Sequence, residues 1–326
     1  MIAEQVAPVC LVIGVNGQDG SYLAERLLIG GYHVVGIGRQ KTSEWVSETC
    51  NQFTYYQYDL NNAAEFGDVL EKFAPDYIYH AAAVHGSAGF NYEAVWHSAH
   101  AVNSLITHAV LEYCRVNVKS RFVYLSSSKL FKFSDGDVVT EETIRKSDCI
   151  YSITKNTSFN LIEYYRKRHL INASVVYTFN HESVRRSRDF FIPKIVNILK
   201  KSMSDSNYRE GVSSLSFFCD WGCAREYMDL VFDISHKAIG SDFVVASGAT
   251  LWGNDFVNEL FSRYGLSAGN HVYEVAPLNN QEKVRRPWLV NCEKLDKYIS
   301  RTPSKSVYEV CDEILNFDLR GLSERA

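Results

Sequence analysis

The first half of the chain alternates between continuous apolar runs and segments whose apolar residues recur at helical spacing. Residues 8–15 (PVCLVIGV) form a continuous run rich in β-branched residues, which is typical of a strand buried on both faces. Residues 19–31 (DGSYLAERLLIGG) combine helical spacing with glycines at the end, which indicates a helix. By the same criteria we expect strands at 33–38, 53–60, 75–83, 121–128 and 172–180, and helices at 63–73, roughly 95–116, and 151–170.

Strand–helix alternation with short connections predicts a parallel sheet covered by helices on both faces. We therefore expect an α/β fold whose first domain, residues 1–180, is a Rossmann-type doubly wound parallel sheet that binds NADP. After about residue 180 the pattern changes to short mixed elements rich in Arg, Phe and Trp. We interpret residues 181–326 as a smaller mixed α/β C-terminal substrate-binding cap, some of whose segments return to the main sheet.

Composition excludes several classes of protein. With 326 residues, 46% hydrophobic and 22% charged, the chain has the composition of a soluble globular protein. The net charge of −4 and the scattered basic residues argue against nucleic-acid binding. The N-terminus has no basic segment, and its apolar run is too short to cross a bilayer, so we expect neither secretion nor membrane insertion. The eight cysteines have no metal-ligand spacing, and we interpret them as reduced thiols of a cytoplasmic protein without a metal site.

A glycine-rich turn follows the first strand. Gly14, Gly17 and Gly20 form a GxxGxxG motif between a buried strand and a helix, where glycine lets the backbone approach a pyrophosphate at the helix N-terminus. The alternative is a turn that only packs tightly, but the position at the start of a strand–helix unit favours dinucleotide binding. We further expect the cofactor to be contacted by Gln18, Asp19, Asp59, Leu60 and Ala82, and by Tyr151 and Lys155.

The end of the second strand bears on the choice of cofactor. An acidic residue there would accept hydrogen bonds from a ribose 2′-hydroxyl and repel a 2′-phosphate. The sequence instead has GIGRQK, with Arg39 at the position expected to lie near the 2′ group. Arg39 therefore favours NADP over NAD; the alternative is a solvated surface arginine.

A strand that ends in hydroxyl residues faces a Tyr-x-x-x-Lys helix start. The run VYLSSSKLF contains Ser127, and YSITK follows with Tyr151 and Lys155. Positions i and i+4 share a helical face, so Tyr151 and Lys155 can reach the same cleft. We expect Lys155 to lower the pKa of Tyr151, so that the phenol exchanges a proton with a sugar hydroxyl that Ser127 holds.

These motifs, in this order, resemble the extended short-chain dehydrogenase/reductase family of nucleotide-sugar enzymes, and within it the GDP-mannose 4,6-dehydratases. The similarity extends from the N-terminus to about residue 290. The resemblance is carried by GQDGSYLAE (17–25), AAAVH (81–85), SSSKLF (126–131), YSITK (151–155), FNHESVRR (179–186), FIPKI (191–195) and DWGCAREYM (220–228).

The resemblance implies a nucleotide-sugar substrate, with a GDP-sugar favoured. Tyr151 would start oxidation at C4 of the sugar, with Lys155 and Ser127 as its partners. Family members also form at least homodimers through a four-helix interface that includes the helices near 95–116 and 151–170, so we expect a homodimer or homotetramer. The substrate-contacting positions would be Asn180, Lys194 and Arg286, together with His85, for which we prefer a hydrogen-bonded role beside the sheet.

Lys129 departs from the dehydratase pattern. That pattern has a hydroxyl residue, a serine and a glutamate, and the glutamate removes the C5 proton and helps the C6 hydroxyl to leave as water. The chain keeps Ser127 and Ser128 but has Lys129 in place of the glutamate. In one interpretation a neutral Lys129 acts as the base, giving a 4,6-dehydratase-like enzyme, which is our first choice. In a second, elimination is lost and a 4-ketoreductase or 4-epimerase remains.

In a third interpretation Lys129 turns outward or pairs with a carboxylate, and the chain is a catalytically weakened, nucleotide-binding paralogue. The complete set of Ser127, Tyr151 and Lys155 argues against it, because a pure binder needs no proton relay. Other departures are Ile13 for a threonine before the first glycine, Val184 for a proline beside the nicotinamide, and Cys219 for an arginine that holds the nucleotide. The loss of the arginine at Cys219 argues against GDP-mannose as the substrate more strongly than it argues against nucleotide sugars in general.

Overall fold

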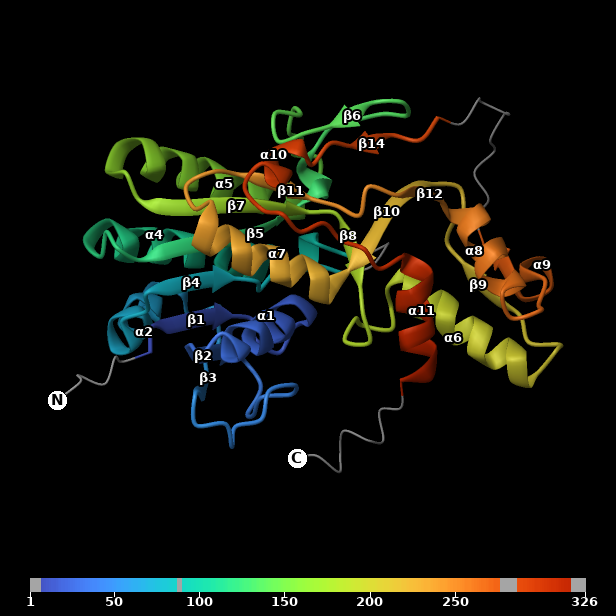
Figure 1. Cartoon of the computed structure of the whole chain (residues 1–326), viewed down its shortest axis with the longest axis horizontal. Helices are drawn as coiled ribbons and strands as arrows, with labels where there is room; N and C mark the ends of the chain where they lie inside the picture. Colours follow the sequence, from blue (N-terminus) through green and yellow to red (C-terminus); the bar gives the residue numbers. More distant parts are fainter. Residues whose placement is uncertain (1–6, 87–89, 276–285, 318–326) are drawn as a thin grey trace.

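The computed structural model describes residues 7–86, 90–275 and 286–317. Its centre is a seven-stranded sheet in the order β11-β7-β5-β4-β1-β2-β3, and every neighbouring pair is parallel (Figure 1). The expected α/β fold with a doubly wound parallel sheet is confirmed. The strands are β1 (Val9–Ile13), β2 (His33–Gly38), β3 (Phe53–Gln57), β4 (Tyr77–His80), β5 (Arg121–Ser127), β7 (Asn172–Thr178) and β11 (Phe243–Val245).

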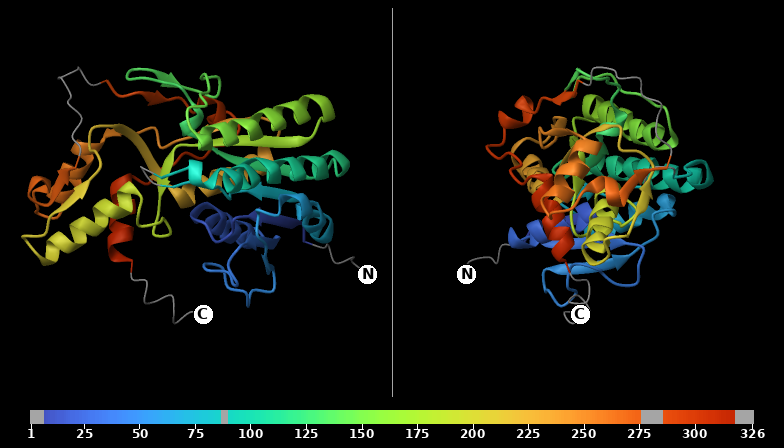
Figure 2. Two further views of the ribbon diagram at one scale, coloured as in Figure 1. Left: turned by 180° about the vertical axis from the view of Figure 1, so that it is seen from behind. Right: turned by 90° about the vertical axis from the view of Figure 1, so that its right-hand side faces the viewer.

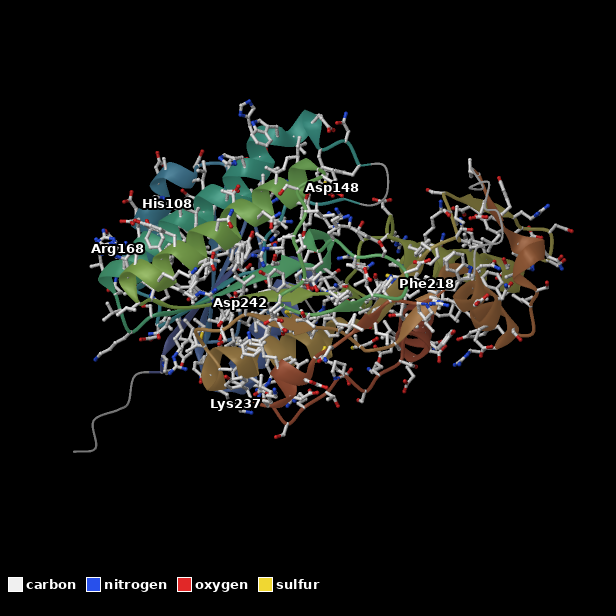
Figure 3. All side chains as sticks on the ribbon, turned by 90° about the horizontal axis from the view of Figure 1, so that it is seen from above. His108, Asp148, Arg168, Phe218, Lys237 and Asp242 are labelled. Atoms are coloured by element: carbon white, nitrogen blue, oxygen red, sulfur yellow. The ribbon has the colours of Figure 1, made fainter. Side chains whose placement is uncertain are left out.

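Helices cover both faces of this sheet because side chains alternate along each strand. Leu11 and Ile13 of β1 pack into the cluster formed with α2 (Phe66–Phe73), α4 (Ile106–Val116) and α5 (Ile150–His169). Their neighbours Cys10 and Val12 pack on the other face, against α1 (Gln18–Ile29), α7 (Ala224–Lys237) and the segment that includes α10 (Glu293–Asp296). Figure 2 shows α4 and α5 on the face opposite to α1 and α7. In Figure 3, His108 of α4 and Lys237 of α7 lie on opposite sides of the sheet.

The second half of the chain builds a separate cap with its own apolar core. A three-stranded sheet joins β8 (Asn180–Glu182), β10 (Phe218–Cys223) and β12 (Thr250–Trp252), and β9 (Glu210–Val212) pairs with β13 (Val272–Glu274). The cap helices are α6 (Phe191–Ser204), α8 (Gly253–Ser262), α9 (Ala268–His271) and α11 (Val307–Asn316). Meanwhile β11, α7 and α10 return to the main sheet, as Figure 1 shows. The division of the chain at residue 180 stays a prediction.

The expected helix at 95–116 is interrupted. A 3-10 turn, η2 (Glu93–Val95), leads into α3 (Trp96–His100), then into one π-helical turn, η3 (Ala101–Leu105), and only then into α4. The π-helical turn contains Asn103 and Ser104, two buried polar residues. Such turns are frequent at functional sites, because the extra residue redirects side chains.

Small elements complete the main domain. They are the 3-10 turns η1 (Ala63–Glu65) and η4 (Ser128–Leu130), and the pair of β6 (Val138–Val139) with β14 (Leu289–Val290). Within the described ranges, the helices are too short or too polar to cross a membrane.

Candidate active site

The glycine turn forms a tight cradle before α1. Gly14 has φ +92°, in the left-handed region that glycine adopts readily, and a Cβ there would lie 2.7 Å from the Ala82 nitrogen. A Cβ on Gly20 would overlap the Gly14 carbonyl oxygen, and one on Gly17 would lie 3.3 Å from it. Only this close packing brings the helix N-terminus of α1 up to the end of β1. The residues present therefore fit the pyrophosphate of a dinucleotide.

Gln18 and Asp19 connect this cradle to the cap. The Gln18 amide donates to the carbonyl of His181 at 3.1 Å, and the Ser183 hydroxyl donates to the Gln18 Oε1 at 2.9 Å. His181 Nε2 lies 2.8 Å from Asp19 Oδ1. Burial alone would raise the pKa of Asp19, but the charges of His181 and Arg186 and two hydrogen bonds lower it to about 2. These two residues thus hold α1 against β8, in addition to the cofactor contacts predicted for them.

The other expected cofactor residues lie along the same edge of the sheet. Arg39 is exposed immediately after β2, and its carbonyl accepts a hydrogen bond from Gln57 at 3.1 Å. Asp59 follows β3 and is exposed, while Leu60 packs against the main core cluster. Ala82 follows β4 and closes over Gly14. No acidic side chain lies directly after β2, so the cradle has no carboxylate there to repel a 2′-phosphate.

Ser127, Tyr151 and Lys155 meet at the carboxyl end of β5. Ser127 is the last residue of that strand, Tyr151 lies in the first turn of α5, and Lys155 follows one turn later. Lys155 is 2% exposed, its Nζ donates to the Leu125 carbonyl at 2.8 Å, and it lies 6.0 Å from the centre of the Tyr151 ring. The three chemically active residues expected from the sequence are therefore brought together.

One expectation about this set is wrong. Burial raises the pKa of Tyr151 above its ordinary value, and the hydrogen bond with Ser127 offsets only part of this. The Lys155 ammonium points to a backbone carbonyl instead of the phenol, and burial lowers the pKa of Lys155 itself to about 7. In the protein by itself, Lys155 therefore does not lower the pKa of Tyr151, because desolvation dominates.

The π-helical turn supports this arrangement through Asn103. Its Oδ1 accepts from the Val84 amide at 2.9 Å, and its Nδ2 donates to the Thr154 hydroxyl at 3.1 Å. The Asn103 carbonyl accepts from the Tyr124 hydroxyl at 2.9 Å. Asn103 therefore fixes the segment after β4 to the start of α5, directly behind Tyr151. The helical spacing of the sequence gave no signal for this turn.

A cavity of about 660 Å³ opens between the cap and two segments of the main domain, the one after β4 and the turn after β5. Its lining includes three of the four residues predicted to contact substrate, His85, Asn180 and Lys194, as well as Lys129. Lys194 Nζ donates to the Gly211 carbonyl at 2.9 Å. Arg286 is exposed near Gly136 and does not line the cavity, so the structure does not bring it to the other three.

Lys129 enters the cavity because the chain turns directly after β5. Residues 128–130 form the η4 turn, whose start is capped by the Ser127 hydroxyl accepting from the Lys129 amide at 3.2 Å. Ser128 becomes buried, while the Lys129 side chain is exposed, with its Nζ 6.0 Å from the centre of the Tyr151 ring. Burial of part of its length and the charge of Arg186 lower the pKa of Lys129.

His85 is a neutral residue whose ring packs on the phenol ring of Tyr151. Its ring centre lies 4.5 Å from that of Tyr151, and its Nδ1 is 2.5 Å from the Tyr92 hydroxyl. Burial, followed by the charges of Lys129, Arg186 and Lys155, lowers the pKa of His85 to about 3. The hydrogen-bonded role that we preferred for His85 agrees with this environment, and the same side chain also lines the cavity.

Sequence reasoning missed two charged residues of the cavity wall. Glu182 is 2% exposed, and Arg186 Nε lies 3.6 Å from its Oε2. Burial raises the pKa of Glu182 to about 7, although Arg186 and His181 oppose the shift. Both residues lie in FNHESVRR, so the motif itself was visible, but only the packing of β8 against β10 shows that Glu182 is buried.

Comparison with known proteins agrees with this geometry. The family model of GDP-mannose 4,6 dehydratase matches residues 11–296, which include the glycine turn, Ser127, Tyr151 and Lys155. The chain belongs to the GDP-mannose 4,6-dehydratase family. GDP-mannose 4,6 dehydratase 2 of Caenorhabditis elegans is 30% identical over 295 residues, covering 85% of this chain and 76% of the relative.

Solved structures of other nucleotide-sugar enzymes share the fold with this dehydratase-family chain. A dTDP-glucose 4,6-dehydratase from Bacillus anthracis in complex with NAD matches with a TM-score of 0.79 at 15% identity, covering 98% of this chain and 97% of that one. A UDP-glucose 4-epimerase from Thermotoga maritima with UDP-glucose matches with a TM-score of 0.76 at 16% identity, covering 94% and 97%. At these identities the likeness concerns the fold alone.

Proposed function

We propose that this chain oxidises the C4 hydroxyl of a nucleotide-diphosphate sugar with NADP, giving a 4-keto sugar as the intermediate of its reaction. The observation that carries the proposal is the meeting of Ser127, Tyr151 and Lys155 at the carboxyl end of β5, at the same edge of the sheet as a glycine cradle that fits a dinucleotide. Membership of the dehydratase family supports a nucleotide sugar as the substrate.

Each residue of the set has a separate task. Ser127 holds the C4 hydroxyl by a hydrogen bond, and Tyr151 accepts its proton as the C4–O bond becomes a carbonyl. Bound at the cradle, NADP would supply the hydride acceptor for the C4 hydrogen and a positive ring that favours the tyrosinate. Lys155, with a pKa lowered to about 7, can pass the proton of Tyr151 onward near neutral pH.

The preference for NADP follows from the end of β2. Arg39 is exposed there, and no acidic side chain follows the strand. A guanidinium suits a phosphate because its donors form a planar fork. This argument supports NADP as the cofactor and makes NAD the weaker ligand.

The fate of the 4-keto sugar depends on Lys129, and two outcomes have support. Family membership favours dehydration, in which neutral Lys129 removes the C5 proton and water leaves from C6. The exposure of Lys129 favours a second outcome, reduction or epimerisation without loss of water. The pKa of Lys129 is lowered as well, but Lys129 is far more exposed than Lys155, whose pKa is lowered to about 7. A lysine that stays an ammonium cannot act as a base.

We also propose a homodimer or homotetramer formed through the face of α3, η3, α4 and α5. Large apolar side chains are exposed along it: Trp96 at 39%, Leu105 at 46% and Tyr164 at 57%. Exposed apolar surface of this kind marks interfaces between proteins. Replacing Tyr164 and Leu105 by Ser should shift the sedimentation coefficient towards that of a monomer, and an unchanged coefficient would remove this face from the assembly.

The mass of the product tests the proposed reaction. Purified protein with NADP is incubated with GDP-mannose, UDP-glucose and their C6-carboxylate counterparts, and the products are analysed by mass spectrometry. Loss of water identifies a dehydratase, a change of two hydrogens a dehydrogenase or reductase, and a new isomer of equal mass an epimerase. If no nucleotide sugar changes and none produces NADPH, the proposed function is wrong.

A further inference from the structure

Lys129 lines the cavity next to Tyr151 without a carboxylate partner among the described residues. Within the described part of the chain, its only hydrogen bond is made by its backbone amide, and its ammonium forms no salt bridge. Of the other cations that line the cavity, Arg186 pairs with Glu182 at 3.6 Å and Lys194 with Glu210 at 3.9 Å, whereas Arg188 has no salt bridge among the described residues. Lys129 is thus an unpaired positive charge on the wall of the cavity.

The surrounding charges make this end of the cavity positive. Lys129, Arg186 and Lys155 together act on His85, which they help to keep neutral. The Glu182 carboxylate is already engaged by Arg186 and does not neutralise Lys129. An unpaired ammonium surrounded by further cations would attract an anionic group of a ligand.

The place of Lys129 next to Tyr151 limits which part of the substrate it can meet. Its Nζ lies 6.0 Å from the centre of the Tyr151 ring, and it is two residues from Ser127. If the C4 hydroxyl of a hexose binds Tyr151, then C1 and its diphosphate lie across the sugar ring, away from this end. The groups that remain close to C4 are the C3 hydroxyl and the C6 substituent on C5.

We propose that Lys129 binds a C6 carboxylate, so that the substrate is a nucleotide-diphosphate hexuronic acid. The inference rests on the proposed oxidation at C4 and deepens it by naming the sugar class. A carboxylate is the anionic group that hexoses carry next to C5, and an ammonium–carboxylate hydrogen bond in a partly closed cavity is strong. Such a substrate has no C6 hydroxyl to lose as water. Its 4-keto form is a β-keto acid, which either takes the hydride back at C4, giving the epimer, or loses the C6 carboxylate as CO2.

The test compares matched pairs of sugars, UDP-glucuronate with UDP-glucose and GDP-mannuronate with GDP-mannose. We expect the wild-type protein to prefer the acid of at least one pair by about 10- to 100-fold in kcat/KM, the range for one hydrogen bond to a charged group. Lys129→Met keeps the length of the side chain but removes its charge, and should bring the acid-to-neutral ratio close to one. Lys132→Met removes an exposed charge three residues away and should leave the ratio unchanged.

Binding measured apart from turnover separates this inference from the proposed function. Trp221 is 3% exposed and lines the cavity, so its fluorescence reports ligand binding. If neutral sugars bind and are oxidised while the acids are not preferred, the carboxylate inference is wrong and the proposed function stands. If Lys129→Met abolishes water loss from a neutral sugar, Lys129 is the elimination base and the inference is also wrong. If no sugar of either kind binds or reduces NADP, the proposed function itself is wrong, and the carboxylate inference, which rests on it, is wrong as well.

Discussion

The imidazole of His181 lies 2.8 Å from the carboxylate of Asp19 and joins the helix after the glycine turn to the first strand of the cap. Burial would lower the pKa of His181, but Asp19 outweighs it and raises the pKa. His181 and the hydrogen bonds around it hold the pKa of Asp19 at about 2. A charged pair therefore connects the main sheet to the cap, next to the glycine turn.

This pair predicts a pH window for stability. The carboxylate has a lowered pKa, so its contribution is present above its ordinary value of 3.8 and is lost as the pH falls towards 2. The imidazole has a raised pKa, so its contribution is present below 6.5 and is lost as the pH rises through the folded value. The pair should stabilise the protein most between pH 3.8 and 6.5, by about 2 kcal/mol.

Urea unfolding of wild type and Asp19→Asn between pH 3 and 8 measures this contribution. We expect the difference in unfolding free energy to be largest inside the window and to shrink on both sides. Asp135→Asn, at an exposed position, serves as the control and should show a small difference at every pH. A difference for Asp19→Asn that does not vary with pH would contradict the assignment of the pair.

The glycine cradle predicts opposite effects at two glycines. Gly20→Ala should destabilise the protein and weaken NADP binding, because its Cβ would overlap the Gly14 carbonyl. Gly67 lies in α2 with open space around it, so Gly67→Ala should leave the unfolding free energy unchanged or raise it by up to about 1 kcal/mol. Melting temperatures and NADP titrations check both variants. Equal effects of the two substitutions would show that the close packing at Gly20 has no consequence.

Arg39 should determine the choice of cofactor. The wild-type protein is expected to bind NADP at least about tenfold more tightly than NAD, because a guanidinium pairs with the 2′-phosphate. Arg39→Asp should remove or reverse this preference, whereas Lys119→Asp, an exposed position just before β5, should not alter it. Titration of both cofactors gives the ratio, and equal affinities in the wild-type protein contradict the prediction.

Tyr151→Phe should lower turnover by at least about 100-fold while NADP still binds, because the phenol is the positioned proton acceptor. Tyr164→Phe is a matched control on the same helix, since Tyr164 is 57% exposed and faces away from the cavity. We expect it to keep nearly full turnover. Near-normal turnover in Tyr151→Phe would remove Tyr151 from the proposed role.

Local sequence signals predicted the elements that position the site. The apolar run of β1, the glycines after it, and the Tyr-x-x-x-Lys spacing are all contained within short segments, and each is found where expected. The i, i+4 spacing fixes Tyr151 and Lys155 on one helical face in any helix. Their meeting with Ser127 follows because parallel strands present their carboxyl ends at one edge.

The remaining features depend on contacts distant in sequence. The π-helical turn at Asn103 is held by Val84 and Thr154, so helical periodicity could not reveal it. The direction of the Lys129 side chain is set by the turn η4, which begins directly after Ser127. The alternation of side chains along a strand could not predict this direction, because β5 ends at Ser127. Arg286 was placed by resemblance to the family, and its exposure near Gly136 depends on how the segment before β14 packs.

The most direct test of the account is hydride transfer from C4. A nucleotide sugar carrying deuterium at C4 is mixed with the protein and NADP, and NADPH absorbance is followed by stopped flow. The account predicts a transient NADPH signal that forms more slowly with the deuterated sugar, carries the label, and is absent in Tyr151→Phe. Conversion of the sugar without any NADPH signal and without an isotope effect would contradict oxidation at C4 by Ser127, Tyr151 and Lys155.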